Sequence, residues 1–377
     1  MGDRRVPLDV SVTAQRIRVR FVDGPEGEFT AMGLRDNQPA DRDAHSGQRL
    51  VDIADLPSNL AIGSARTDGD DLVVAWADGT TTAYHLEWLY QQCRPAWAER
   101  PELRPRLWLD GAGMDGTTAF AWSSPESLAT SDVARLDWLT RLTVDGIAFL
   151  SGVPSAEGSI LEALRHVGRV AETNYGLLFD VRSVARPENL AYSDFGLGLH
   201  TDNPYRDPVP GFQALHVLVS SPDGGDSLLA DGFALAEHLR DTDPESFRVL
   251  TTTAVPFLYR SAGADLYSEK PLIRLDVRGK VVAVHYNNRS IAPLRLQPDD
   301  ADAFYCAYRR FAELLRDPRF QVRLKLGDGD LMVFDNQRTL HGRTAFSSAR
   351  HPRHLQGCYL TRDSVLSEAA MLRRRTA

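Results

Sequence analysis

The chain has 377 residues, of which 43% are hydrophobic and 25% are charged, proportions that are ordinary for globular proteins and argue against disorder. Its formal net charge of −8 argues against a nucleic-acid partner, which would favour a basic surface. The three cysteines, Cys93, Cys306 and Cys358, are widely spaced and predict no disulfide framework. No apolar run approaches the roughly 18 residues that span a bilayer, and the start of the chain has no apolar signal-peptide core. We therefore expect a cytoplasmic protein with no membrane partner.

Residues 1–94 have the pattern of a small β-rich domain. In AQRIRVRFVDG, residues 14–24, the alternation of Ile17, Val19 and Phe21 predicts a strand with one apolar face. Residues 71–93 predict a hairpin that turns at Asp78-Gly79 and runs into a short helix. Three prolines within RPAWAERPELRPRLW then indicate a linker, which we place at residues 95–113.

Residues 114–377 predict a larger domain that is also mainly β. Apolar residues at helical spacing predict helices over 131–146, behind a cap at Ser131 or Asp132, over 159–176, and over 299–317, with another helix closing the chain. Between them lie many short apolar runs separated by glycine turns, a pattern that indicates a sandwich or barrel.

Two stretches of this domain carry the residues of a metal site. In GLGLHTDNPY, residues 196–205, His200 and Asp202 would share one face of a strand, since alternate side chains do so. In GDLMVFDNQRTLHGRTAF, residues 329–346, His341 follows a buried strand and a short turn. Two histidines and one carboxylate form the set that leaves positions open on iron(II), whereas a structural zinc site would be closed.

A third element supports this prediction. Arg353 lies twelve residues after His341, immediately before the strand-like HLQGCYL. The planar fork of an arginine can grip a carboxylate through two parallel hydrogen bonds. An isolated arginine here would otherwise be read as a surface residue.

Five motifs together resemble the γ-butyrobetaine hydroxylase branch of the iron(II)/2-oxoglutarate dioxygenases, within the TauD-like superfamily: LHTDNPYRDPVPGFQALHVL, GGDSLLADGF, VHYNNRS, DNQRTLHGR and RHLQGCYL. The resemblance implies a double-stranded β-helix (a distorted jelly roll) with flanking helices, behind a smaller β-rich domain, and often a homodimer. It implies that His200, Asp202 and His341 bind iron(II) and that Arg353 binds the C5 carboxylate of the cosubstrate 2-oxoglutarate. With dioxygen, such an enzyme hydroxylates an unactivated C–H bond and releases succinate and CO2.

The resemblance also implies a small-molecule substrate that is cationic at one end and anionic at the other. Relatives hold a trimethylammonium group in an aromatic cage by cation–π attraction. The matching residues here are Tyr175, Phe179, Tyr192 and Tyr359, with Phe179 standing where some relatives carry tryptophan. For the anionic end, the matching asparagines are Asn189 and either Asn287 or Asn288. Arg289 would bind a carboxylate or a phosphonate, or would be a solvated hairpin residue.

The first candidate substrate is γ-butyrobetaine. Within the same class, the alternatives are a 2-trimethylaminoethylphosphonate hydroxylase and a trimethyllysine hydroxylase. From other classes, the alternatives are a non-catalytic jelly-roll binding protein and a zinc hydrolase on a β scaffold. The complete set of iron ligands together with Arg353 argues against both.

One departure from the family lies in the N-terminal domain. Well-known butyrobetaine hydroxylases carry a zinc site there, built from three cysteines and a histidine, whereas this chain has Gln38, Ala40 and Asp43 at the cysteine positions and Thr80 at the loosely aligned histidine position. We therefore expect this domain to depend on its apolar core alone.

Overall fold

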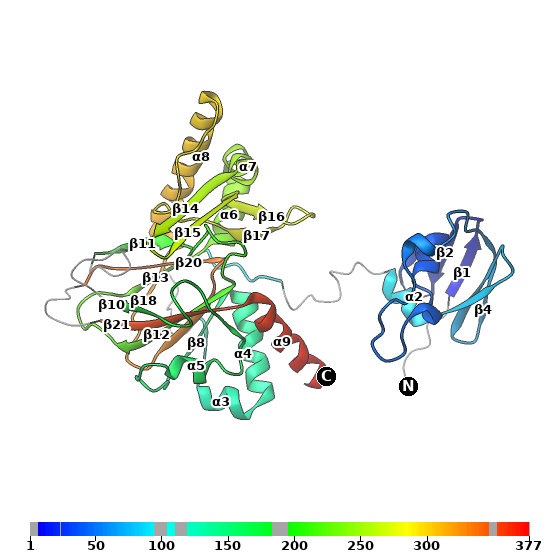
Figure 1. Ribbon diagram of the computed structural model, residues 1–377, viewed down its shortest axis with the longest axis horizontal. Helices are drawn as coiled ribbons and strands as arrows, with labels where there is room; N and C mark the ends of the chain where they lie inside the picture. Colours follow the sequence, from blue (N-terminus) through cyan, green and yellow to red (C-terminus); the bar gives the residue numbers. More distant parts are fainter. Residues whose placement is uncertain are drawn as a thin grey trace. The chain divides into compact units, whose positions relative to one another are not determined.

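The computed structural model describes residues 7–22, 24–93, 104–109, 119–182, 195–346 and 353–376 of the chain. It forms two compact units, Met1–Pro101 and Glu102–Ala377, both drawn in Figure 1. Within the described ranges, no helix is both long and apolar enough to cross a membrane.

The N-terminal unit consists of two three-stranded antiparallel sheets and short helices. The first sheet holds β1 (Pro7–Val12), β2 (Arg16–Phe21) and β3 (Glu26–Thr30), and the second holds β4 (Ile62–Asp68), β5 (Asp71–Trp76) and β6 (Thr81–His85). Helices α1 (Ala31–Asp36) and α2 (Leu86–Gln92) and the 3-10 turns Pro39–Asp41 and Ile53–Asp55 complete it. The predicted alternation in β2 and the predicted hairpin between β5 and β6, followed by a short helix, are both confirmed.

A cluster of hydrogen bonds links the two halves of this unit. The hydroxyl of Thr82 accepts a hydrogen bond from the buried indole of Trp76 (2.9 Å) and donates one to Gln38 (2.7 Å). The guanidinium of Arg35 donates to the same Gln38 side chain. The expectation of an apolar core alone is therefore incomplete. The side chain beside Gln38 is that of Thr82, whereas Thr80 bonds to Asp78 within the turn.

The second unit contains the jelly roll. Its larger sheet has seven strands, in the order β10-β21-β12-β19-β8-β7 with β9 beside β21, and its smaller sheet has the order β11-β20-β13-β18. All pairings are antiparallel except that of β7 with β8. The strands are β7 (Ala121–Ser123), β8 (Ile147–Leu150), β9 (Val170–Ala171), β10 (Phe179–Arg182), β11 (Leu197–His200), β12 (Phe212–Val219), β13 (Ser227–Asp231), β18 (Val322–Leu324), β19 (Leu331–Asp335), β20 (Thr339–Arg343) and β21 (His354–Leu360).

The two sheets pack face to face around one apolar core. Leu215 and Phe334 from the larger sheet meet Leu229 and Val322 from the smaller one in a single buried cluster. The predicted fold, mainly β with flanking helices and built on a double-stranded β-helix, is confirmed.

Helices cover the outer faces. Helices α4 (Asp132–Asp145) and α9 (Arg362–Thr376) bury apolar residues in a second cluster with the larger sheet. A third cluster joins the smaller sheet to an insertion (Figure 1). This insertion comprises α6 (Gly232–Thr242), α7 (Pro244–Thr252), α8 (Pro298–Arg316), the hairpin of β14 (Val255–Ser261) and β15 (Ala264–Lys270), and the hairpin of β16 (Ile273–Leu275) and β17 (Val281–Val284). The remaining short elements of this unit are α3 (Pro125–Thr130), α5 (Ser159–Ala163) and the 3-10 turn Pro318–Phe320.

The helix predictions succeed at α4, α8 and α9 and fail at one place. Ser131 caps α4 by accepting from the N–H of Ala134, as its sequence predicts. The helix predicted over 159–176 is wrong beyond Ala163, since α5 ends there and the chain goes on to β9. A Cβ at Gly168 would lie 2.6 Å from the side chain of Val365 in α9, so the segment after α5 packs closely against that helix.

Residues 104–109, within the predicted linker, are bound to the second unit. Arg106 forms two hydrogen bonds with the carboxylate of Asp145, and the indole of Trp108 donates to the Asp145 carbonyl. The backbone N–H of Trp108 donates to Asp231, whose carboxylate also forms a fully buried ion pair with Arg338. This end of the predicted linker is therefore part of the jelly-roll unit.

The Thr82 cluster generates a stability prediction. Thr82→Val keeps the side-chain shape but leaves the buried N–H of Trp76 unpaired, which costs about 1–3 kcal/mol. For a domain of this size, each kcal/mol lowers Tm by about 4–8 °C. Scanning calorimetry of the full chain should show the N-terminal transition moving down for Thr82→Val but not for the exposed neighbour, Thr81→Val. Equal transitions for the two variants would show that the cluster contributes nothing.

Candidate active site

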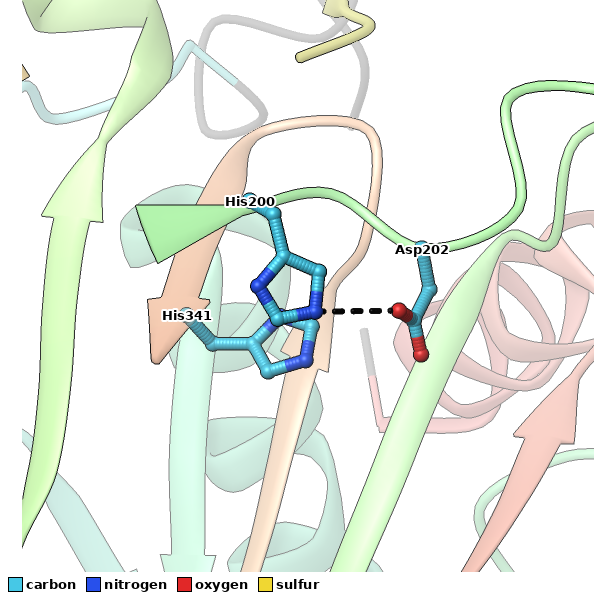
Figure 2. A group of neighbouring side chains, drawn as sticks. All are labelled: His200, Asp202 and His341. Carbon is cyan, nitrogen blue, oxygen red and sulfur yellow. Dashed lines mark ion pairs between the residues drawn. The ribbon is translucent and has the colours of Figure 1, made fainter. Parts of the chain in front are cut away.

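The metal-binding residues meet where β11 pairs with β20. The register places His200 opposite His341, and their rings lie 4.3 Å apart, centroid to centroid. Asp202 follows on the loop after β11, as Figure 2 shows. One ligand atom from each of His200, Asp202 and His341 lies within 4.8 Å of the others, and the described residues contain no second group of this kind.

The hydrogen bonding of His200 prepares it to bind a cation. Its Nδ1 lies 2.8 Å from the carbonyl oxygen of Gly198, so Nδ1 carries the proton, and its Nε2 lies 3.2 Å from Oδ1 of Asp202. Burial lowers the pKa of His200, which keeps the ring neutral and leaves a lone pair on Nε2. Two electron-rich atoms then face each other, and a cation between them satisfies both. The residues therefore fit a metal ion.

His341 is equally suited to binding metal as a neutral ring. Burial lowers its pKa to about 3, so it carries no charge at neutral pH. Its ring lies 4.7 Å from that of Phe334, and its buried Nδ1 has no hydrogen-bond partner among the described residues.

Asp202 is ionised and its backbone is fixed. Burial raises its pKa, but interactions with the two histidines and with Arg289 outweigh this effect and hold the pKa well below the usual carboxyl value. The side chain of Asn336 accepts from the N–H of Asp202 (2.7 Å) and donates to its carbonyl (3.0 Å). Asn336 thereby holds the loop that presents the carboxylate.

The metal ligands line a cavity that Arg353 also enters. Arg353 is 9% exposed, and its guanidinium lies 5.6 Å from the ring of Phe346. Burial and the nearby Arg343 lower its pKa to about 10, so that it remains charged at neutral pH. Within the part of the chain that the structure describes, no carboxylate forms an ion pair with it. A Cβ at Gly225, where φ is +68°, would lie only 3.0 Å from Arg353 Cδ, so this glycine makes room for the arginine. This arrangement fits the distal carboxylate of 2-oxoglutarate.

Aromatic residues form another wall of the same cavity. Tyr175, Phe179 and Tyr359 all line it, with ring centroids 6.4 Å apart for Tyr175 and Phe179 and 5.1 Å apart for Phe179 and Tyr359. Arg289 lines it as well. Although much of the Arg289 residue is exposed, burial of its guanidinium among the cavity walls lowers its pKa.

The remaining predicted substrate residues lie elsewhere. Asn287 is buried beside the cavity, where its amide donates to the Thr201 carbonyl and accepts from the N–H of Arg289. Asn288 is exposed and does not line the cavity. Asn189 and Tyr192 lie outside the described residues.

Sequence reasoning missed several residues that line the cavity or support its walls. Arg343 lies two positions after His341 in β20, and alternate residues of a strand share one face. The sequence therefore already indicated that Arg343 points to the same side as His341. Asn336 directly follows β19, as the first residue of the β19–β20 turn, and carried a weaker signal. Asn203 and Tyr205 act through a loop conformation that no sequence pattern indicates.

A jelly roll that brings two histidines, a carboxylate and a buried arginine to one cavity defines an iron(II)/2-oxoglutarate-dependent dioxygenase. Residues 112–359 match the family described as "Taurine catabolism dioxygenase TauD, TfdA family", and residues 8–90 match "Gamma-butyrobetaine hydroxylase-like, N-terminal". The chain belongs to the TauD, TfdA family, which confirms the predicted enzyme class and its need for iron(II), 2-oxoglutarate and dioxygen.

Named relatives match nearly the whole chain. Gamma-butyrobetaine dioxygenase of Pseudomonas sp. (strain AK-1) is 37% identical over 96% of this chain and 94% of its own length. The Homo sapiens enzyme of the same name is 30% identical over 96% of this chain and 95% of its own length. Mitochondrial trimethyllysine dioxygenase of Gallus gallus is 30% identical over 87% of this chain and 79% of its own length.

Different residues of the cavity would bind the metal ion, the cosubstrate and the substrate. When bound, iron(II), 2-oxoglutarate and dioxygen supply the oxidation of a C–H bond, with release of succinate and CO2. His200, Asp202 and His341 would hold the ion, and Arg353 would orient the cosubstrate by its distal carboxylate. The aromatic wall would limit the access of water and orient the substrate.

The position of Arg353 generates a binding prediction. Arg353→Met removes a charge-assisted pair with the cosubstrate, and a loss of about 1.5–3 kcal/mol corresponds to a KM for 2-oxoglutarate about 10- to 160-fold higher. The matched control is Arg309→Met, which removes an arginine that is 82% exposed on α8. Steady-state assays that vary 2-oxoglutarate would contradict the assignment if the two variants had the same KM.

Proposed function

We propose that this dioxygenase hydroxylates a small trimethylammonium acid, with γ-butyrobetaine as the first candidate. The observation that carries the proposal is the aromatic wall of Tyr175, Phe179 and Tyr359 in the cavity that contains the metal ligands. The 37% identity to a gamma-butyrobetaine dioxygenase along nearly the whole chain supports it.

The aromatic wall suits the cationic end of such a substrate. Each ring face attracts a quaternary ammonium group through its quadrupole, by about 0.5–2 kcal/mol depending on desolvation. The wall consists of two tyrosines and one phenylalanine and contains no carboxylate, so its attraction for a cation comes from the ring faces. Tyr192 would complete the cage that the family resemblance predicts.

Arg289 suits the anionic end. Its guanidinium faces the cavity and offers paired donors to a carboxylate or a phosphonate. Asn287 would act indirectly by bonding to the backbone of Arg289, and it is favoured over Asn288, which does not line the cavity. Asn189 remains a predicted substrate contact. The arginine is also why 2-trimethylaminoethylphosphonate is the second candidate substrate.

A substrate comparison tests the proposal. The purified protein, supplied with iron(II), ascorbate and 2-oxoglutarate in air, is incubated separately with γ-butyrobetaine, 2-trimethylaminoethylphosphonate and trimethyllysine. NMR should show succinate and hydroxylated product in equal amounts, and the largest kcat/KM with γ-butyrobetaine. Asp202→Ala, which lacks one of three metal ligands, serves as the inactive control. Coupled turnover with only one of the other two compounds would replace the proposed substrate.

Phe179 provides a test of the cation preference. Phe179→Leu keeps an apolar side chain but removes one ring, which should raise the KM for γ-butyrobetaine by about 2- to 30-fold. The KM for the uncharged-head isostere 5,5-dimethylhexanoate and that for 2-oxoglutarate should change much less. The control is Phe195→Leu, which alters a phenylalanine that is 70% exposed. If Phe179→Leu raised the KM for γ-butyrobetaine and the KM for its isostere equally, the ring would contribute only its shape and no attraction for the cation.

The family resemblance also predicts a homodimer. Light scattering on the purified protein should give a mass twice that of one chain. A monomer mass would contradict the predicted assembly and leave the active site unaffected.

A further inference from the structure

The two oxygens of Asp202 have different partners. Oδ1 faces Nε2 of His200, whereas Oδ2 accepts a hydrogen bond of 2.9 Å from the hydroxyl of Tyr359. Tyr359 is only 4% exposed, and it comes from β21, 157 positions along the chain from Asp202. One oxygen is therefore available to an ion, and the other is already bound by the protein.

The hydrogen bonds around Tyr359 run in one direction only. An ionised carboxylate can only accept, so the Tyr359 hydroxyl must donate its single proton to Asp202. The same hydroxyl oxygen lies 2.9 Å from Nδ2 of Asn203, which can only donate. The opposite orientation of the Asn203 amide would place its oxygen against the Tyr359 oxygen, two acceptors with no proton between them. The Asn203 amide is therefore fixed with Nδ2 toward Tyr359.

The chain of donors continues away from the metal site. Oδ1 of Asn203 accepts from the hydroxyl of Tyr205 (2.6 Å), and the Tyr205 oxygen lies 3.0 Å from the hydroxyl of Tyr175. Because the proton of Tyr205 is used on Asn203, Tyr175 must donate to Tyr205. The four side chains thus form an ordered series of donors from the aromatic wall to Asp202.

Asn203, the middle residue of this series of hydrogen bonds, has an unusual backbone conformation. Its φ is +55°, in the left-handed region, and it is the one non-glycine residue with positive φ among the described residues. Asparagine tolerates this conformation better than most residues, but it still carries strain. Asn203 is 5% exposed, so its amide has no solvent alternative to these two partners.

We propose that Tyr359 is a positioning residue for Asp202, oriented by Asn203, Tyr205 and Tyr175, that keeps Oδ2 from the metal so that the carboxylate binds through Oδ1 alone. This role goes beyond that of a ring in the substrate cage. It deepens the proposed function and rests on the metal site but not on the identity of the substrate. It also joins the wall that contacts substrate to a metal ligand through continuous hydrogen bonds.

Metal binding without turnover tests the proposal. Mn(II), an air-stable substitute for iron(II), is titrated into the full chain while the EPR signal of free Mn(II) is recorded. Tyr359→Phe keeps the ring and removes the donor to Asp202. Losing such an outer partner of a metal ligand typically costs 10- to 100-fold in affinity, and we expect a weakening in that range. The KM for the trimethylammonium substrate is recorded beside the Mn(II) affinity, so that an effect on the cage is distinguished from loss of the donor to Asp202.

Two further variants and a control sharpen the test. Tyr205→Phe leaves the Tyr359–Asp202 bond in place and should weaken Mn(II) binding in the same direction but less. Asn203→Gly tolerates the positive φ, keeps Tyr359 and removes its orienting amide, so it should also weaken binding. Tyr308→Phe removes a hydroxyl from a partly buried tyrosine of α8 that does not line the cavity, and it should bind Mn(II) like the wild type.

Two results would overturn the proposal, and they are distinguishable. If Tyr359→Phe binds Mn(II) within about twofold of the wild type while the KM for the cationic substrate rises, Tyr359 is a cage residue only. If the wild-type protein binds no Mn(II), the metal site fails and the proposal fails with it.

Discussion

The active site depends on the register in which β11 pairs with β20. That pairing sets His200 opposite His341, and a slip of one strand by one residue would turn its imidazole to the other face of the sheet, away from the partner histidine. Gly342 allows the close approach, because a Cβ there would collide with the carbonyl oxygen of Leu197. The beginning of β20 is held by the buried ion pair between Arg338 and Asp231, so the scaffold fixes the ligands before any metal binds.

Different parts of the cavity favour ligand groups of opposite charge. Buried Arg343 and Arg353 make one part strongly cationic, which suits a dicarboxylate cosubstrate that must also reach the metal. The aromatic wall offers the opposite preference and attracts a cation. Since burial strengthens both effects, one small cavity can hold two ligands of different charge in a defined order.

Much of this could be predicted from the sequence, because its signals are local. Periodicity and a serine cap specify α4, and the motif from His200 to Asp202 with His341 specifies the metal site. The failures have non-local causes. The segment after Ala163, predicted as helix, instead packs through Gly168 against α9, and the partnership of Gln38 with Thr82 joins residues 44 positions apart. The Tyr359–Asn203 series depends on a left-handed backbone that no periodicity reveals.

The central claim is that His200, Asp202 and His341 hold an iron ion to which 2-oxoglutarate binds beside Arg353. The most direct measurement is an anaerobic titration of the protein with iron(II) and then 2-oxoglutarate, followed by visible absorption. We expect a weak metal-to-ligand charge-transfer band that requires both additions and is absent from Asp202→Ala. A wild-type protein without the band, or a variant that retains it, would contradict the assignment.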